Sequence, residues 1–294
     1  MLEYPSLYMS ANRATARGQR YYVSAFAANL IALSLASLFA FFDTSEEVWR
    51  KMLASGVAIC MLISFACTST ITAANLRKQW YLGRAMAESV KSASWRYAMK
   101  AEPYSSEVDA SSNLTQVLQE VMQECVDSGL ILEASASKQT ALTKSMTETR
   151  EMDVNDRLQS YIKHRVQDQN KWYSTKSSEA IAAAKYWFGA IAVAQLAGFS
   201  LAIAAVAYSG LPLGLAGMIA AVAASSAAWI QVKRYDENGQ AYLTTAHELG
   251  MIEARSSKVA GETDLQNFVE DSESAMSREH TLWLARRNVL KQRV

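Results

Sequence analysis

The sequence is poor in the residues that interrupt helices. It contains three prolines in 294 residues, at Pro5, Pro103 and Pro212. Proline is costly inside a helix, and no stretch of useful length alternates polar and apolar residues as a half-buried strand does. The scarcity of proline and the missing alternation together predict an all-α protein.

Cysteine and histidine are equally scarce, with three of each. No CxxC pair and no His/Cys cluster occurs, so we expect no disulfide framework, no metal site and no cofactor. The sequence also lacks a P-loop, a dinucleotide-binding glycine pattern and a G-x-S-x-G elbow, and we therefore expect no enzyme. A net charge of +1 gives no reason to expect nucleic acid as a partner.

Charge is missing from four long stretches, at about 21–42, 52–76, 186–208 and 213–232. A bilayer core of about 30 Å takes roughly 20 helical residues, so each stretch is long enough to cross it. The stretches fall in two pairs, which predicts four transmembrane helices arranged as two hairpins; a buried hairpin in a soluble helical protein is the alternative. Without an embedded charge, a proton-coupled pump or an ion-coupled transporter is disfavoured.

Basic residues cluster at the outer ends of both hairpins. They are Arg13, Arg17, Arg20, Arg77, Lys78, Arg84, Lys176, Lys185, Lys233 and Arg234. The two short connectors carry no such excess. By the positive-inside rule, both termini and the long middle region are expected in the cytoplasm, and the protein is expected to be a multi-pass membrane protein.

The polar parts of the chain show helical periodicity. Apolar residues recur every three or four positions across 113–129, 158–173 and 265–289, which predicts long amphipathic cytoplasmic helices. These apolar stripes must pack against each other or against neighbouring subunits. The predicted fold is thus an all-α membrane protein with two hairpins and long amphipathic cytoplasmic helices.

Hydroxyl and amide side chains crowd the second half of the second span. Ser64, Thr68, Thr72 and Asn75 are candidates to line a pore, because hydroxyls can face water without the cost of a charge in the membrane. The same hydroxyls can instead bond back to their own helix. Asn29 is a lone amide in the first span and is expected to pair with another helix.

Charged and aromatic residues also gather on the polar helices. The candidates for gating or assembly are Arg84, Glu88, Trp95, Arg165, Trp172, Tyr173, Glu279 and Trp283. An aromatic belt with helix-to-helix ion pairs is the plainer interpretation. Each half of the chain further shows a hairpin followed by an amphipathic helix with an acidic residue, Glu88 or Glu248, which predicts a parallel topological repeat.

Three segments carry a resemblance to a known family. Residues 83–88 followed by Trp95 and Pro103-Tyr104, the run 161–173, and the run 277–283 resemble the helices that flank the hairpin of SLATT proteins, two-transmembrane effector domains of bacterial conflict systems. The resemblance implies two fused units, 1–108 and 151–294, joined by a helical connector, 109–150.

The resemblance also implies a function. SLATT proteins are proposed to be pore-forming effectors that damage the membrane of their own cell when a partner senses infection. We therefore expect a homo-oligomeric pore in the lipid bilayer that opens on a signal and depolarises the cell, with a signalling nucleotide or a sensor protein as a partner. A constitutive channel or small-solute permease, and a non-conducting scaffold that recruits a cytoplasmic partner, remain the alternatives.

Overall fold

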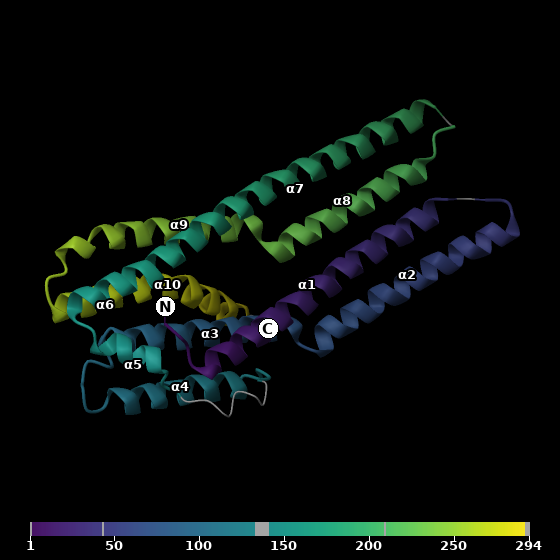
Figure 1. Ribbon diagram of the computed structural model, residues 1–294. Helices are drawn as coiled ribbons and strands as arrows, with labels where there is room; N and C mark the ends of the chain where they lie inside the picture. The colour runs from purple at the N-terminus through teal and green to yellow at the C-terminus, as the bar shows by residue number, and fades with distance from the viewer. Residues whose placement is uncertain (1, 43, 133–140, 209, 292–294) are drawn as a thin grey trace. The chain divides into compact units, whose positions relative to one another are not determined.

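The computed structural model describes residues 2–42, 44–132, 141–208 and 210–291, with side chains in the last range as far as Ser277. Within these ranges the chain forms helices and no strand (Figure 1). It divides into two compact units. We call residues 20–76 and 178–239 the membrane unit, and residues 1–19, 77–177 and 240–294 the polar unit.

The membrane unit contains the four long apolar segments. They lie in α1 (Ser6–Phe41), α2 (Glu47–Ala73), α7 (Gln167–Ala207) and α8 (Leu213–Lys233). Each of these segments is long and apolar enough to cross a membrane. Few of their residues are buried, as suits helices that face lipid. The predicted all-α membrane protein with four spans in two hairpins is thereby confirmed.

Small and polar residues hold the spans together. The Ser64 hydroxyl of α2 donates a 2.6 Å hydrogen bond to Oδ1 of Asn29 in α1, which confirms the pairing expected for this amide. In the other hairpin Gly198 of α7 faces Ile219 of α8, and a Cβ there would meet Cγ2 of Ile219 at 3.4 Å, an ordinary contact distance. The hydroxyls of Ser34 and Ser225 lie 3.2 Å apart and connect α1 to α8. Small residues allow this close approach in lipid.

Both hairpins leave the membrane unit in the same way. At Asn75, after α2, and at Arg234, after α8, the backbone takes a left-handed conformation, with φ of 48° and 49°. Another helix follows each of these residues at once: α3 (Leu76–Ala98) and α9 (Tyr235–Ala254). The shared geometry supports the topological repeat predicted from the sequence.

The polar unit packs its helices around one apolar core. Besides α3 and α9 it includes α4 (Ala110–Asp127), α5 (Lys144–Glu151), α6 (Val154–Tyr161), a π-helical turn η2 (Ile162–Val166), a short 3₁₀ turn η3 (Ser256–Lys258) and α10 (Glu262–Lys291). Its core includes Met86, Trp95, Leu114, Tyr161 and Leu265, each at most 1% exposed. As far as Ser277, the apolar stripes predicted from the sequence therefore pack against one another, and the part of the third stripe beyond Ser277 lies outside the described side chains.

The first turns of α1 cross α3 at very short range. A Cβ on Gly83 would lie 2.7 Å from Oγ1 and 2.8 Å from N of Thr15, and one on Gly18 would lie 2.6 Å from N of Trp80. Because the obstructing atoms include backbone, the two helices cannot yield by turning a side chain. Glycine at both positions thus sets the distance between α1 and α3.

Because of this crossing, we expect Gly83→Ala to destabilise the protein, which is the opposite of the usual effect of this substitution in a helix. Glycine to alanine normally stabilises a helix, by up to about 1 kcal/mol. At Gly83 the added methyl must push α1 from α3, so we expect destabilisation of about 1–3 kcal/mol. The melting temperature of the protein in neutral detergent measures it.

Gly250→Ala is the matched control. A Cβ at Gly250 of α9 would meet Nδ2 of Asn170 at an ordinary 3.6 Å, so this variant should melt at the same temperature as the parent or above it. Equal melting of the two variants would show that the α1–α3 crossing is not close-packed.

Candidate functional site

The polar unit contains a fully buried ion pair between two helical segments far apart in sequence. Arg165 in η2 donates from Nε to Oε1 of Glu273 in α10 at 2.8 Å, and from Nη2 to Oε2 at 2.7 Å. The two side chains are 1% and 0% exposed. This is the parallel two-bond geometry that guanidinium and carboxylate groups favour.

Burial makes each partner dependent on the other. Burial alone would lower the pKa of Arg165, but the charge and hydrogen bonds of Glu273, followed by the charge of Glu88, outweigh it and raise that pKa. Burial, together with the charge of Arg165, lowers the pKa of Lys91 nearby. Removing one member of a buried pair leaves the other charge without compensation, which costs far more than the pair contributes as a whole.

An aromatic frame surrounds the ion pair. The Tyr161 hydroxyl donates to Oε1 of Glu273 at 2.9 Å, and its ring packs edge-on against Trp95 of α3 and Phe268 of α10. Nε1 of Trp95 donates to the hydroxyl of Tyr4 at 2.9 Å. Burial raises the pKa of Tyr4 to about 12, and burial followed by the charge of Glu273 raises that of Tyr161. Both phenols therefore stay protonated and can serve as hydrogen-bond donors.

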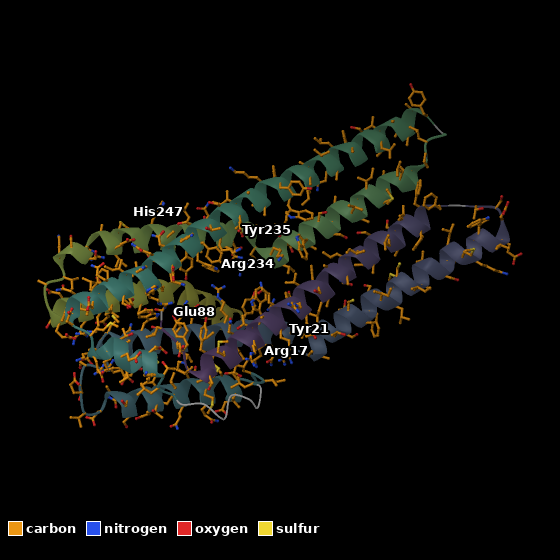
Figure 2. The ribbon with its side chains drawn as sticks, in the orientation of Figure 1. Arg17, Tyr21, Glu88, Arg234, Tyr235 and His247 are labelled. Carbon is orange, nitrogen blue, oxygen red and sulfur yellow. The ribbon has the colours of Figure 1, made fainter. Side chains whose placement is uncertain are left out.

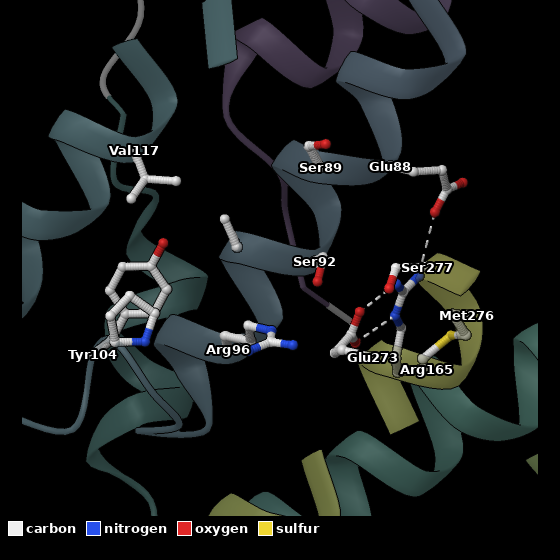
Figure 3. A pocket seen from close by; sticks show the side chains of 12 residues that line it. Glu88, Ser89, Ser92, Arg96, Tyr104, Val117, Arg165, Glu273, Met276 and Ser277 are labelled. Atoms are coloured by element: carbon white, nitrogen blue, oxygen red, sulfur yellow. Dashed lines mark hydrogen bonds and ion pairs between the residues drawn. The ribbon is translucent and has the colours of Figure 1, made fainter. Parts of the chain in front are cut away.

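Glu88 stands beside the pair as a second carboxylate. Its Oε2 lies 3.9 Å from Nη1 of Arg165, and its side chain is 40% exposed (Figure 3). Nη1 has no hydrogen-bond partner among the described residues. Arg165 and Glu88 both face a cleft of about 320 Å³ between α3, α4, η2 and α10. We call the group of Arg165, Glu273, Glu88, Tyr161, Trp95 and Tyr4 the Arg165 cluster.

Two further buried arginines close the carboxyl end of α3. Arg150 donates from Nη1 to the carbonyl of Tyr97 at 2.7 Å, and Arg157 donates from Nη1 to the carbonyl of Met99 at 3.1 Å. Arg157 also forms a two-bond pair with Glu262 of α10. Cations suit this end of a helix, where carbonyl groups lack partners in the helix and the dipole is negative. The arginines thus fix α3 against α5, α6 and α10.

The predicted gating and assembly residues fall in different places. Trp95, Arg165 and Glu88 meet in the Arg165 cluster. Trp172 and Tyr173 instead pack against Tyr242 of α9, with ring centroids 5.3 and 5.7 Å away. Arg84 is half-buried on α3. Glu279 and Trp283 lie outside the residues whose side chains the structure describes.

The acidic residues Glu88 and Glu248, which the sequence analysis named for the two exit helices, do not occupy equivalent positions in the structure. Counted from the left-handed residues Asn75 and Arg234, Glu88 of α3 corresponds to His247 of α9, the residue before Glu248 (Figure 2). His247 is exposed. The two exit helices therefore share their geometry but differ in the chemistry at the position of Glu88.

Three of the candidate pore residues, Ser64, Thr68 and Thr72, recur every four residues along α2 but differ in their contacts. Ser64 bonds to Asn29 across the hairpin, and Thr72 donates to the carbonyl of Thr68 in its own helix. Thr68 and Thr72 are exposed, while Asn75 is the left-handed residue that ends the hairpin. Ser64 therefore holds the hairpin together, and Thr68 and Thr72 face outward.

Sequence reasoning missed the partnership of Arg165 with Glu273 and the roles of Tyr4 and Arg150. Glu273 offers one signal, because it falls at helical spacing within the apolar stripe of Leu265, Val269 and Met276. A carboxylate on a buried face needs a buried cation. Among the described residues no group of three or more His, Cys, Asp or Glu side chains could hold a metal ion.

The architecture defines a class of protein: a multi-pass helical membrane protein made of two hairpins with helical flanks. Two family models match the chain in the same order. Residues 5–158 match the SMODS and SLOG-associating 2TM effector domain 3, and residues 161–283 match the SMODS and SLOG-associating 2TM effector domain 1. The chain therefore belongs to the SLATT family and carries two fused units of it.

The matched ranges meet near α6. The first includes the segment 109–150, which the sequence analysis set apart as a connector. No curated protein matches the chain. No solved structure matches it either.

The buried pair predicts a large loss of stability for Glu273→Gln. The amide cannot neutralise the Arg165 charge, so we expect a loss of about 3–5 kcal/mol. Asp271→Asn on the same helix is the matched control, since Asp271 pairs at 3.4 Å with Arg255 in an exposed position; such pairs contribute about 0–1 kcal/mol. Thermal unfolding of both variants in neutral detergent measures the difference, and comparable losses would argue against a stabilising role for the buried pair.

Proposed function

We propose that the protein is a homo-oligomeric pore-forming effector of the bacterial inner membrane, which opens on a signal and depolarises the cell. The observation that carries this proposal is the membership of both halves in a family of two-transmembrane effector domains. The four spans and the absence of a charged residue from their apolar stretches support a passive path rather than a coupled transporter. The basic residues at the hairpin ends support a cytoplasmic polar unit.

The path through the membrane is proposed to run along α2 of several copies. Thr68 and Thr72 are exposed on this helix, and hydroxyls that face outward in one chain can line a water-filled path when copies assemble around an axis. Asn75 extends this row of polar residues to the end of the hairpin. Ser64 also belongs to the row, but its hydroxyl is bonded to Asn29 of α1. An open path also needs an apolar face toward lipid, and the exposed Ile59 and Ile63, which helical spacing places on the side of α2 opposite Thr68 and Thr72, provide it.

The polar unit is proposed to hold the closed state. α3 follows directly from the end of α2, and α7 runs without a break from η2, which carries Arg165, into the third span. A change in the Arg165 cluster can therefore pass along two helices that lead to the membrane unit. Trp172, Tyr173 and Arg84 are proposed to act on this coupling, and Glu279 and Trp283 on assembly. The signal comes from a nucleotide or from a sensor protein.

The pore is tested by ion flux from liposomes of purified protein and by membrane potential in induced cells. The double variant Thr68→Leu/Thr72→Leu should reduce ion flux by about tenfold or more, because an apolar pore lining dewets and then blocks ions. Thr70→Leu is the control: Thr70 is exposed on the same helix, bonds back to the carbonyl of Ala66 and points to another side. Ser64 is left unchanged because its replacement would break the hairpin contact.

Three results would contradict the proposal in different ways. Flux that is equal in the double variant and in Thr70→Leu would remove α2 from the pore. Flux without depolarisation or growth arrest in cells would favour a constitutive channel or permease. No flux from any assembled preparation, and a steady potential in infected cells, would favour a scaffold.

A further inference from the structure

The cleft beside Arg165 combines a buried cation with an apolar wall. Its volume of about 320 Å³ falls within the range of small-molecule sites, roughly 300–1,000 Å³. It is bordered by α3, α4, η2 and α10, all within the polar unit. Arg96 and Arg165 both line it, as Figure 3 shows.

One polar group in the cleft lacks a partner. Glu273 accepts from Nε and Nη2 of Arg165, but Nη1 of this 1% exposed residue has no hydrogen-bond partner among the described residues. Buried N–H groups without a partner are rare and costly, and a charged one more so. The nearest anionic atom is Oε2 of Glu88 at 3.9 Å, beyond hydrogen-bond distance. Nη1 can therefore donate a hydrogen bond to an additional anionic oxygen.

The cleft also has an apolar lining, which favours a ligand with an apolar body. Val117, Met276, Pro103 and the ring of Tyr104 line it. Arg96 contributes a second guanidinium, which donates one hydrogen bond to the carbonyl of Glu102 at 3.3 Å. Ligand sites commonly join a mostly apolar lining to a few polar groups that fix orientation.

We propose that this cleft binds a small ligand that carries one carboxylate or phosphate group on an apolar body. The anionic group binds Nη1 of Arg165 and the guanidinium of Arg96, and the body packs against Val117 and Met276. The ligand competes with Glu88 for Arg165, because two anions at one guanidinium repel each other. Binding moves the Glu88 carboxylate away from η2. Binding itself is independent of the pore; that it acts as the opening signal rests on the proposed function.

Phenyl phosphate is the probe, titrated at neutral pH against the full chain in neutral detergent by calorimetry or by ligand-observed NMR. Phenylacetate tests the carboxylate in place of the phosphate. Inorganic phosphate tests the head group alone, and benzyl alcohol tests the body alone. We expect saturable binding of phenyl phosphate or phenylacetate at millimolar concentration or below, and binding at least about tenfold weaker for the two fragments.

Glu88→Gln gives the sharpest test because it should strengthen binding. Removing the competing charge should tighten phenyl phosphate about tenfold, whereas a purely structural role for Glu88 predicts no change or a loss. Asp271→Asn, the same kind of change on an exposed carboxylate, should leave binding unchanged. Ser92→Leu fills the cleft from α3 without altering a charge and should weaken binding about tenfold or more.

Several outcomes would overturn the inference. One such outcome is no saturable binding of either anionic probe up to about 10 mM, which is about ten times the expected upper range. Another is binding that is indifferent to both Glu88→Gln and Ser92→Leu, since the probe would then sit elsewhere. If inorganic phosphate bound as tightly as phenyl phosphate, the apolar body would make no contribution to binding. Binding that tightens in Glu88→Gln while liposomes show no flux would overturn the pore and leave the site intact.

Discussion

The ion pair of Arg165 and Glu273 lies inside the apolar core of the polar unit, which could not hold either charge without the other. Arg165 enters the core from η2, and Glu273 of α10 binds it with two hydrogen bonds in full burial. Tyr161, Trp95 and Tyr4 complete the polar contacts, so helices from both family units share one network. An apolar core could have provided stability alone. A buried pair instead fixes which helices meet and in which register.

Two helical segments that contribute to this network, α3 and η2, are continuous in the chain with the second and third spans. Glu88 belongs to α3, which begins directly after Asn75, the residue that follows the second span. Arg165 lies in η2, and α7 continues from there into the third span. A carboxylate that is 40% exposed and 3.9 Å from its cation can move at little cost. A fully buried partner such as Glu273 cannot. The exposed contact of Arg165 with Glu88 is therefore the weaker of its two ion pairs, and the buried contact with Glu273 is the stronger.

Sequence patterns were sufficient for the spans and insufficient for the cluster. Runs such as 21–42 and 213–232 lack charge, and that alone specifies membrane helices. Arg165 and Trp95 could be selected as unusual residues, yet their partners depend on how α3, η2 and α10 cross, which local periodicity does not encode. Ser64 shows the same limit: a hydroxyl in a span can face water or a neighbouring helix, and only the position of Asn29 decides it. Gly83 begins the run 83–88 that resembles the family, but the sequence did not show that its missing side chain sets the α1–α3 distance.

The central claim is that Arg165 and Glu273 act as one unit, and a double-mutant cycle tests it most directly. Arg165→Met and Glu273→Leu are compared singly and together by the free energy of unfolding in neutral detergent. Each single variant leaves an uncompensated buried charge, and the double variant leaves none. We predict that the double variant recovers most of the stability lost by either single variant, so with single losses of about 3–5 kcal/mol the coupling is at least about 4 kcal/mol. Losses that add within about 0.5 kcal/mol would contradict the account.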